Sequence, residues 1–206
     1  MQYVYLHGFA SGNNAQKANF FKEKLAGLGI NLIIPDLNED DFANLTMTRQ
    51  INSVKKLIDP NSPVILFGSS MGGLLALLLA EELNNVSRII LFAPALEMVK
   101  RWTGRKDDMG QWKQAGSKMV YHYGYKKDMP LNYSFIEDLA TYEDEIFTKK
   151  IPTLIFHGTQ DTAVPHIVSV TYAKGKDYVH YHEVESDHSL EDQLDYMWQV
   201  IQEFIK

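Results

Sequence analysis

The stretch VILFGSSMGG, residues 64–73, constrains the fold more than any other part of this 206-residue chain. It begins with four large apolar residues, as a buried strand does, and the residues after it, LLALLLA, favour a helix. Two serines and three glycines stand between the two elements. A sharp turn from a strand into a helix needs small residues where the two pass close together. The stretch therefore predicts a strand, a tight turn and a helix.

Short apolar runs alternate with helix-like segments along the rest of the chain. Strands are predicted at residues 3–6, 31–35, 64–67, 89–92, 153–156 and 178–184, and helices at 14–28, 46–58, 71–84, 135–147, 166–174 and 189–205. Most of the strands are continuously apolar, which favours parallel strands covered on both faces. We therefore expect an α/β fold, a three-layer sandwich with a mainly parallel sheet of about six strands, in a single domain over residues 1–206.

One long segment, residues 97–133, breaks this alternation and is rich in aromatic residues. Because long loops without secondary structure are uncommon in compact domains, we expect elements of its own, such as a hairpin that pairs KMVYHYGY with GQWKQAG. We interpret it as a small cap inserted over the carboxyl edge of the sheet, where α/β proteins bind ligands. The alternative is an ordinary surface insertion whose aromatic side chains pack on the core.

Ser70 is the candidate nucleophile, because Gly68 and Gly72 flank it as G-x-S-x-G. Ser69 fits this pattern less well, since Phe67 and Met71 would take the flanking positions. The stretch lacks the lysine of a phosphate-binding loop and the glycine spacing of a dinucleotide fingerprint. A structural turn with an idle serine remains the alternative.

A serine nucleophile needs a base and an acid that orients the base, in the chain order serine, acid, histidine. Asp161 follows a predicted strand in HGTQDTAVP, and His188 lies in ESDHSLED just before the last predicted helix. Both the order and the loop positions fit a catalytic triad. Asp187 is the weaker candidate for the acid.

Two backbone N–H groups are predicted to stabilise an oxyanion. Met71 stands at the start of a helix, where N–H groups have no intrahelical acceptor. Phe9 follows the first strand in YLHGFASG, the loop that usually supplies the second donor. His7 and His157, each before a glycine at a strand end, are interpreted as structural.

Composition excludes several other classes of protein. The chain has no cysteine, which excludes disulfide frameworks and thiolate metal sites and favours a reducing compartment. Its net charge of −6 gives no basic footprint for nucleic acid. The N-terminus does not resemble a signal peptide, and the longest apolar run is too short to span a bilayer. We expect a cytoplasmic protein with a small-molecule partner, no membrane insertion and no nucleic acid.

No metal or other cofactor is predicted. His180 and His182 share one face of the last predicted strand, so a metal pair is conceivable there. No third ligand stands near them in the sequence, and a metal site needs at least three.

These residues together resemble the α/β-hydrolase superfamily and, more narrowly, the small bacterial YqiA-type esterases. The segments YLHGFASGNNAQKANFF, LIIPDLN, GSSMGGLLA and FAPAL match that group over roughly the first 95 residues. The segments HGTQDTAVP and SDHSL match α/β-hydrolases in general. The resemblance implies the same triad, Ser70, Asp161 and His188, and the same oxyanion donors, Phe9 and Met71.

The resulting hypothesis is a serine hydrolase that cleaves a carboxylic ester or thioester through an acyl-enzyme intermediate. The same triad would serve an amidase, a peptidase or an acyltransferase, and a non-catalytic ligand-binding homologue could also retain it. The physiological substrate is not predicted. A set of insertion aromatics is expected to wall an apolar acyl pocket: Trp102, Trp112, Tyr121, Tyr123 and Tyr125.

Overall fold

The computed structural model describes residues 1–103, 106–142 and 147–206. Its main sheet has six strands in the order β2-β1-β3-β4-β7-β8, and every neighbouring pair is parallel. The strands are β1 (Gln2–Leu6), β2 (Leu32–Ile33), β3 (Val64–Ser69), β4 (Val86–Phe92), β7 (Thr153–Gly158) and β8 (Val179–Val184). The prediction of a parallel sheet of about six strands is confirmed.

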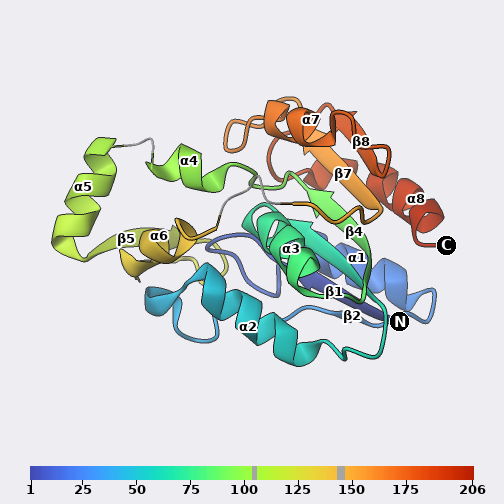
Figure 1. Ribbon diagram of the computed structural model, residues 1–206, viewed down its shortest axis with the longest axis horizontal. Helices are drawn as coiled ribbons and strands as arrows, with labels where there is room; N and C mark the ends of the chain where they lie inside the picture. The colour runs from blue at the N-terminus through green and yellow to red at the C-terminus, as the bar shows by residue number, and fades with distance from the viewer. Residues whose placement is uncertain (104–105, 143–146) are drawn as a thin grey trace.

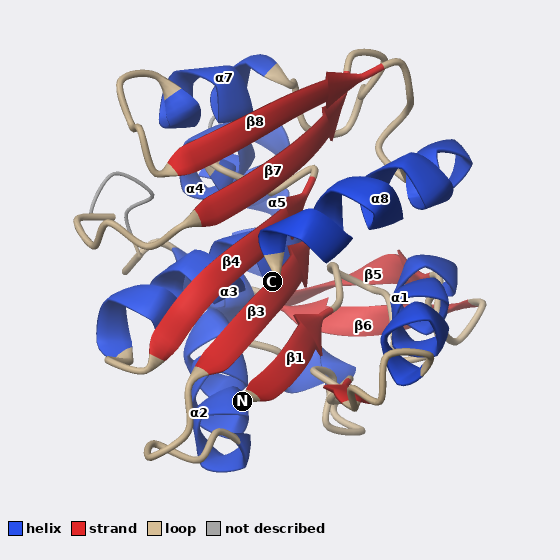
Figure 2. Ribbon diagram, turned by 90° about the vertical axis from the view of Figure 1, so that its right-hand side faces the viewer, coloured by secondary structure: helices blue, strands red, loops and turns tan. Residues whose placement is uncertain are grey.

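Helices cover both faces of this sheet and complete the three layers. On one face lie α1 (Gln16–Ala26) and α8 (Leu194–Phe204), and on the other lie α2 (Met47–Leu57), α3 (Met71–Glu82) and α7 (Ile167–Ala173) (Figures 1 and 2). The last helix begins five positions later than its sequence suggests. Ser189, the first residue of the predicted helix, does not cap α8. Its hydroxyl donates to Asp187 and accepts from the backbone N–H of Glu191, and a 3₁₀ turn, η2 (Glu191–Gln193), precedes the helix.

Two apolar cores explain why the strands are continuously apolar. The first core, on the side of α2 and α3, includes Leu66 and Leu91, while the second, on the side of α1 and α8, includes Phe67 and Phe92. Neighbouring residues of one strand point to opposite faces of a sheet, so each strand supplies both cores. Burial of both faces fixes the strand register, because a slip of one residue would exchange the two sets.

The segment between β4 and β7 forms a separate group of elements at one end of the sheet (Figure 1). It contains α4 (Met98–Thr103), α5 (Lys106–Ala115), α6 (Ser134–Leu139), and an antiparallel hairpin of β5 (Ser117–His122) and β6 (Lys127–Asn132). The predicted helix 135–147 is therefore short in its described part, and residues 143–146 lie outside the described residues.

The predicted pairing of the hairpin is wrong. Residues 111–115 of GQWKQAG end helix α5, and β5 pairs instead with β6, for example Val120 with Met129. Trp112 explains the difference, because its ring is buried and its indole N–H donates to the backbone oxygen of Leu131, 3.0 Å away. The tryptophan thus anchors the helix onto the hairpin.

Among the residues that the structure describes, no helix is both long enough and apolar enough to cross a membrane.

Candidate active site

Ser70 stands on the tight turn between β3 and α3. Its backbone has φ 53° and ψ −119°, a conformation that residues with a side chain rarely adopt. A methyl group on Gly72 would lie 2.1 Å from the backbone oxygen of Leu6, and one on Gly68 would lie 2.4 Å from that of Gly72. Glycine is therefore required at both flanking positions, and the turn lifts the Ser70 side chain off the end of the sheet.

Ser70, His188 and Asp161 form one continuous line of hydrogen bonds. His188 Nε2 lies 3.0 Å from Ser70 Oγ, and His188 Nδ1 lies 2.6 Å from Asp161 Oδ2. The carboxylate can only accept, so His188 Nδ1 carries the proton and Nε2 is free to accept from the serine hydroxyl. This is the tautomer that a general base needs.

The Asp161 carboxylate is buried and fully hydrogen-bonded. Its Oδ1 accepts from the backbone N–H groups of Ala163 and Val164, at 2.8 and 2.7 Å, while Oδ2 faces both His188 and His157. Burial alone would raise the pKa of the Asp161 carboxyl, but the hydrogen bonds from His157, His188 and Val164 outweigh it and hold this pKa well below its usual range. Asp161 therefore stays ionised beside His188.

His157, interpreted from the sequence as structural, also positions the acid. Its Nε2 lies 3.1 Å from Asp161 Oδ2, and its Nδ1 lies 2.7 Å from the hydroxyl of Ser169. The serine hydroxyl can donate to Nδ1, which leaves the proton on Nε2 to be donated to the carboxylate. The sequence signal for this contact was the spacing of four residues between His157 and Asp161, across the end of β7.

Phe9 and Met71 both line the cavity in front of Ser70. Met71 is the first residue of α3, so its N–H has no acceptor within the helix. His7 fixes the loop that carries Phe9: its Nε2 accepts from the backbone N–H of Leu37 at 3.1 Å, and its Nδ1 faces the oxygen of Gly8 at 3.0 Å. Both residues predicted to donate to an oxyanion therefore line the same cavity as Ser70.

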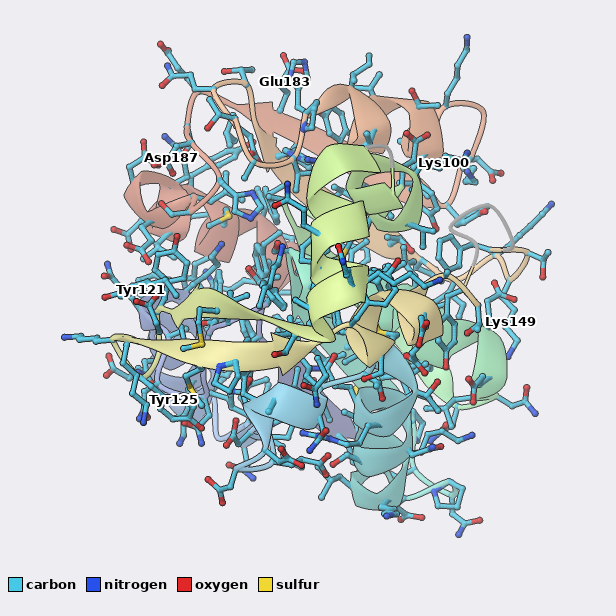
Figure 3. The ribbon with its side chains drawn as sticks, turned by 90° about the vertical axis from the view of Figure 1, so that its left-hand side faces the viewer. Lys100, Tyr121, Tyr125, Lys149, Glu183 and Asp187 are labelled. Carbon is cyan, nitrogen blue, oxygen red and sulfur yellow. The ribbon has the colours of Figure 1, made fainter. Side chains whose placement is uncertain are left out.

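The cavity has a volume of about 600 Å³, within the range of small-molecule sites. Of the five aromatic residues expected to wall it, Trp102 and Tyr123 do so. Trp112 is buried under the hairpin instead, and Tyr121 and Tyr125 are exposed on it (Figure 3). They do not line the cavity, because Tyr121 points to solvent and Tyr125 stacks on His122.

Two cations on the wall of this cavity were not predicted from the sequence. Lys17, in the first turn of α1, and Arg101, on α4, both line it. Nothing in the sequence separates these two side chains from the other lysines and arginines, which are ordinarily exposed.

Among the described residues, no group of three or more histidine and acidic side chains has the arrangement of a metal site. His182, one of the two histidines considered for metal, lies 2.9 Å from the hydroxyl of Tyr196 through its Nδ1.

Comparison with known families and structures agrees with this fold. The family model described as Uncharacterised protein family (UPF0227) matches residues 2–205. No curated protein matches the chain by sequence.

Solved structures are similar over almost the whole chain. A protein from Agrobacterium vitis S4, provisionally assigned as a hydrolase, has a TM-score of 0.87 and 23% identity, covering 100% of this chain and 88% of its own. Alpha/beta hydrolase domain-containing protein 10 from mouse has a TM-score of 0.84 and 22% identity, covering 99% and 89%. Est1E from Butyrivibrio proteoclasticus, solved with ferulic acid bound, has a TM-score of 0.75 and 19% identity, covering 99% and 87%. At these identities the similarity shows the fold, which is that of the α/β-hydrolases.

Proposed function

The chain belongs to the family UPF0227 and resembles its YqiA-type esterases, and we propose that it is a serine hydrolase that cleaves a carboxylic ester or thioester. The observation that carries the proposal is the line of hydrogen bonds from Asp161 through His188 to Ser70. An ionised acid, an imidazole in the productive tautomer and a hydroxyl on a strained turn are rarely aligned in this way unless they have a catalytic role.

In the first half of the reaction, Ser70 Oγ attacks the carbonyl carbon of the substrate while His188 Nε2 takes the hydroxyl proton. The negative charge that develops on the carbonyl oxygen is stabilised by the N–H groups of Phe9 and Met71. The tetrahedral intermediate then collapses, the bond to the leaving oxygen or sulfur breaks, and His188 gives its proton to the leaving group. An acyl group remains on Ser70.

In the second half, water attacks the acyl carbon as His188 takes one of its protons. The bond from the acyl carbon to Ser70 Oγ breaks, the serine recovers its proton from His188, and a carboxylic acid leaves. Asp161 stays ionised throughout and stabilises the imidazolium in both halves. Est1E, solved with a bound carboxylic acid, agrees with a site that releases such a product.

The remaining residues support the same proposal. We assign the segment 97–133 as a cap within one domain over residues 1–206, because α4 places Trp102 on the wall of the cavity. The three neighbours described above carry the same fold, and the triad needs neither metal nor cofactor. The absence of cysteine agrees with a reducing compartment, for which we propose the cytoplasm.

A fluorophosphonate probe followed by intact-mass spectrometry tests the proposal directly. We expect one adduct on the wild type and on Ser69→Ala, and none on Ser70→Ala. On an ester panel, Ser70→Ala should lose about 10⁶ in kcat. Matched anilides separate an esterase from an amidase. A folded wild type that takes no adduct and turns over no ester would contradict the proposal.

A further inference from the structure

The cavity has two chemically different walls. One is built on the core beside α2 and α3 and is apolar, with Phe9, Met98 and Trp102. The other is built on the opposite core, beside α1 and α8, and carries Tyr5 and Lys17. Figure 2 shows that these two sets of helices lie on opposite sides of the sheet. The cavity therefore crosses the end of the sheet and offers the two halves of a substrate different surroundings.

Lys17 is an unusual residue for such a wall. It is only 5% exposed, and its ammonium group lies 5.4 Å from the centre of the Phe92 ring. Within residues 1–103, 106–142 and 147–206, no hydrogen bond or ion pair of this group is found. An ammonium carries three donors, and since no acceptor among the described residues meets them here, they must be satisfied from the cavity that Lys17 lines.

The surroundings of Lys17 keep its charge available near neutral pH. Burial lowers the pKa of Lys17 to about 8, while the negative charges of Glu191, Asp187 and Asp161 oppose this shift. Glu191 and Asp187 are exposed, and Figure 3 shows Asp187 at the periphery of the molecule. The buried end of this wall thus holds a cation, and its outer rim holds two anions.

We propose that Lys17 binds a free carboxylate of the substrate, so that the preferred ester or thioester carries a carboxylate besides the acyl group that Ser70 attacks. The inference rests on the proposed function and names its substrate class. The ammonium would gain the acceptor that the protein does not supply. The hydroxyl of Tyr5, on the same wall, stays protonated, because burial raises its pKa more than the hydrogen bond with Ser69 lowers it.

Charge on the wall favours a carboxylate over a phosphate. One ammonium neutralises the single charge of a carboxylate, whereas a phosphate monoester brings nearly two charges at neutral pH. The excess charge would face Asp187 and Glu191, which line the same cavity. Arg101 also lines the cavity, but it belongs to the cap and not to the α1 side, and it donates to the backbone oxygen of Ala163. The single positive charge on the α1 side of the cavity therefore matches the single negative charge of a carboxylate.

The test compares matched pairs of activated esters in the full-length protein. In each pair the acyl chain ends in a carboxylate, as in adipate and suberate monoesters, or in the corresponding methyl ester. A second set places the carboxylate on the alcohol. We expect the wild type to favour the charged member of at least one set, and Lys17→Met to reduce that ratio of kcat/KM about 30-fold or more. Lys22→Met, which removes an exposed lysine from the same helix, should leave the ratio unchanged.

Several outcomes would overturn the inference while leaving the proposed function intact. These are equal ratios in the wild type and Lys17→Met, an equal loss in Lys22→Met, or stronger competitive inhibition by an alkyl phosphate than by adipate. Inhibition by adipate needs no variant: it should weaken as pH rises through about 8, where Lys17 loses its proton. If Lys17→Met does not fold, the inference is tested by this pH profile of the wild type and by the same ester comparison in Lys17→Gln. Absence of any fluorophosphonate adduct on the wild type would instead remove the proposed function.

Discussion

At the turn after β3, one added methyl group should be enough to disturb the nucleophile. Replacing glycine by alanine inside a helix ordinarily stabilises a protein by roughly 0.5–1 kcal/mol. In Gly72→Ala the new methyl group would lie 2.1 Å from the backbone oxygen of Leu6. We expect this variant to lose about 3 kcal/mol in urea unfolding, because a backbone atom on a central strand cannot move aside cheaply.

Gly110→Ala is the matched control, since Gly110 is also within a helix, α5, and among the described residues a methyl group there would meet no atom within 4 Å outside that helix's own backbone. It should be neutral or slightly stabilising. Equal stability of the two variants would contradict the steric explanation of the G-x-S-x-G pattern.

The identity of the acid that orients His188 can be tested by replacing one carboxylate oxygen with an amide nitrogen. In Asp161→Asn the amide would donate to His188 Nδ1 and force the unproductive tautomer, so kcat should fall by about 10⁴. Asp187→Asn changes the acid that the sequence left as the weaker candidate, and it should keep kcat for a neutral ester close to that of the wild type. Steady-state kinetics on both variants measures this, and the reverse ranking would show that Asp187 orients the base.

Most elements were predictable, and the exceptions have physical reasons. The strands of the main sheet and the helices that cover it alternate along the chain as apolar runs and helix-like segments, and β3 followed by α3 is one example. The pairing of the hairpin was not predictable, because it depends on the burial of Trp112 against Leu131. Ser70, Asp161 and His188 could be proposed from the sequence because each lies in the segment that follows a predicted strand, whereas Lys17 and Arg101 could not. The distances within the triad depend on packing that no local pattern encodes.

Helix α4 should set the preference for the apolar part of the substrate. Trp102 packs edge-on against Phe9, with ring centres 5.3 Å apart, and tilted against Phe135 at 5.5 Å. Trp102→Ala should therefore raise KM for long-chain esters about tenfold, while short-chain esters change less, since a short chain has less apolar surface to bury on this wall.

Tyr121→Ala is the control for this prediction, because Tyr121 is an exposed aromatic residue of the same insertion and does not line the cavity. Kinetics across a series of acyl lengths measures both variants. A loss that is the same for every chain length would argue that Trp102 supports the fold of the cap and does not contact the acyl chain.

For the molecule as a whole, the parallel sheet gathers residues that are far apart in the chain. The segments after β1, β3, β7 and β8 bring Phe9, Ser70, Asp161 and His188 to one edge. The same edge joins the two cores, so a residue of α1 reaches the cavity from the opposite face. This explains why Lys17 could not be predicted as a cavity residue from the sequence. Only the packing of α1 distinguishes it from an exposed lysine such as Lys22.

Burial of Lys17 should lower the stability of the whole fold near neutral pH. The pKa of Lys17 falls from 10.5 to about 8 on folding, so between these values the unfolded chain binds more protons than the folded one. Stability from this group therefore rises with pH over that window. Lys17→Met should be more stable than the wild type at pH 7, by on the order of 3 kcal/mol, and the gap should shrink from pH 8 to 10.5.

Chemical unfolding of both proteins at several pH values, in a buffer without carboxylates, measures this gap, and Lys22→Met should show no such pH dependence. A gap that does not change with pH would mean that the charge of Lys17 is not the cause. Added adipate should narrow the gap at pH 7, because it would bind only the folded wild type and stabilise it by mass action. A lysine that binds substrate should lower the stability of the fold when no carboxylate is bound and restore it when one is bound. A lysine with a structural role should not show this difference.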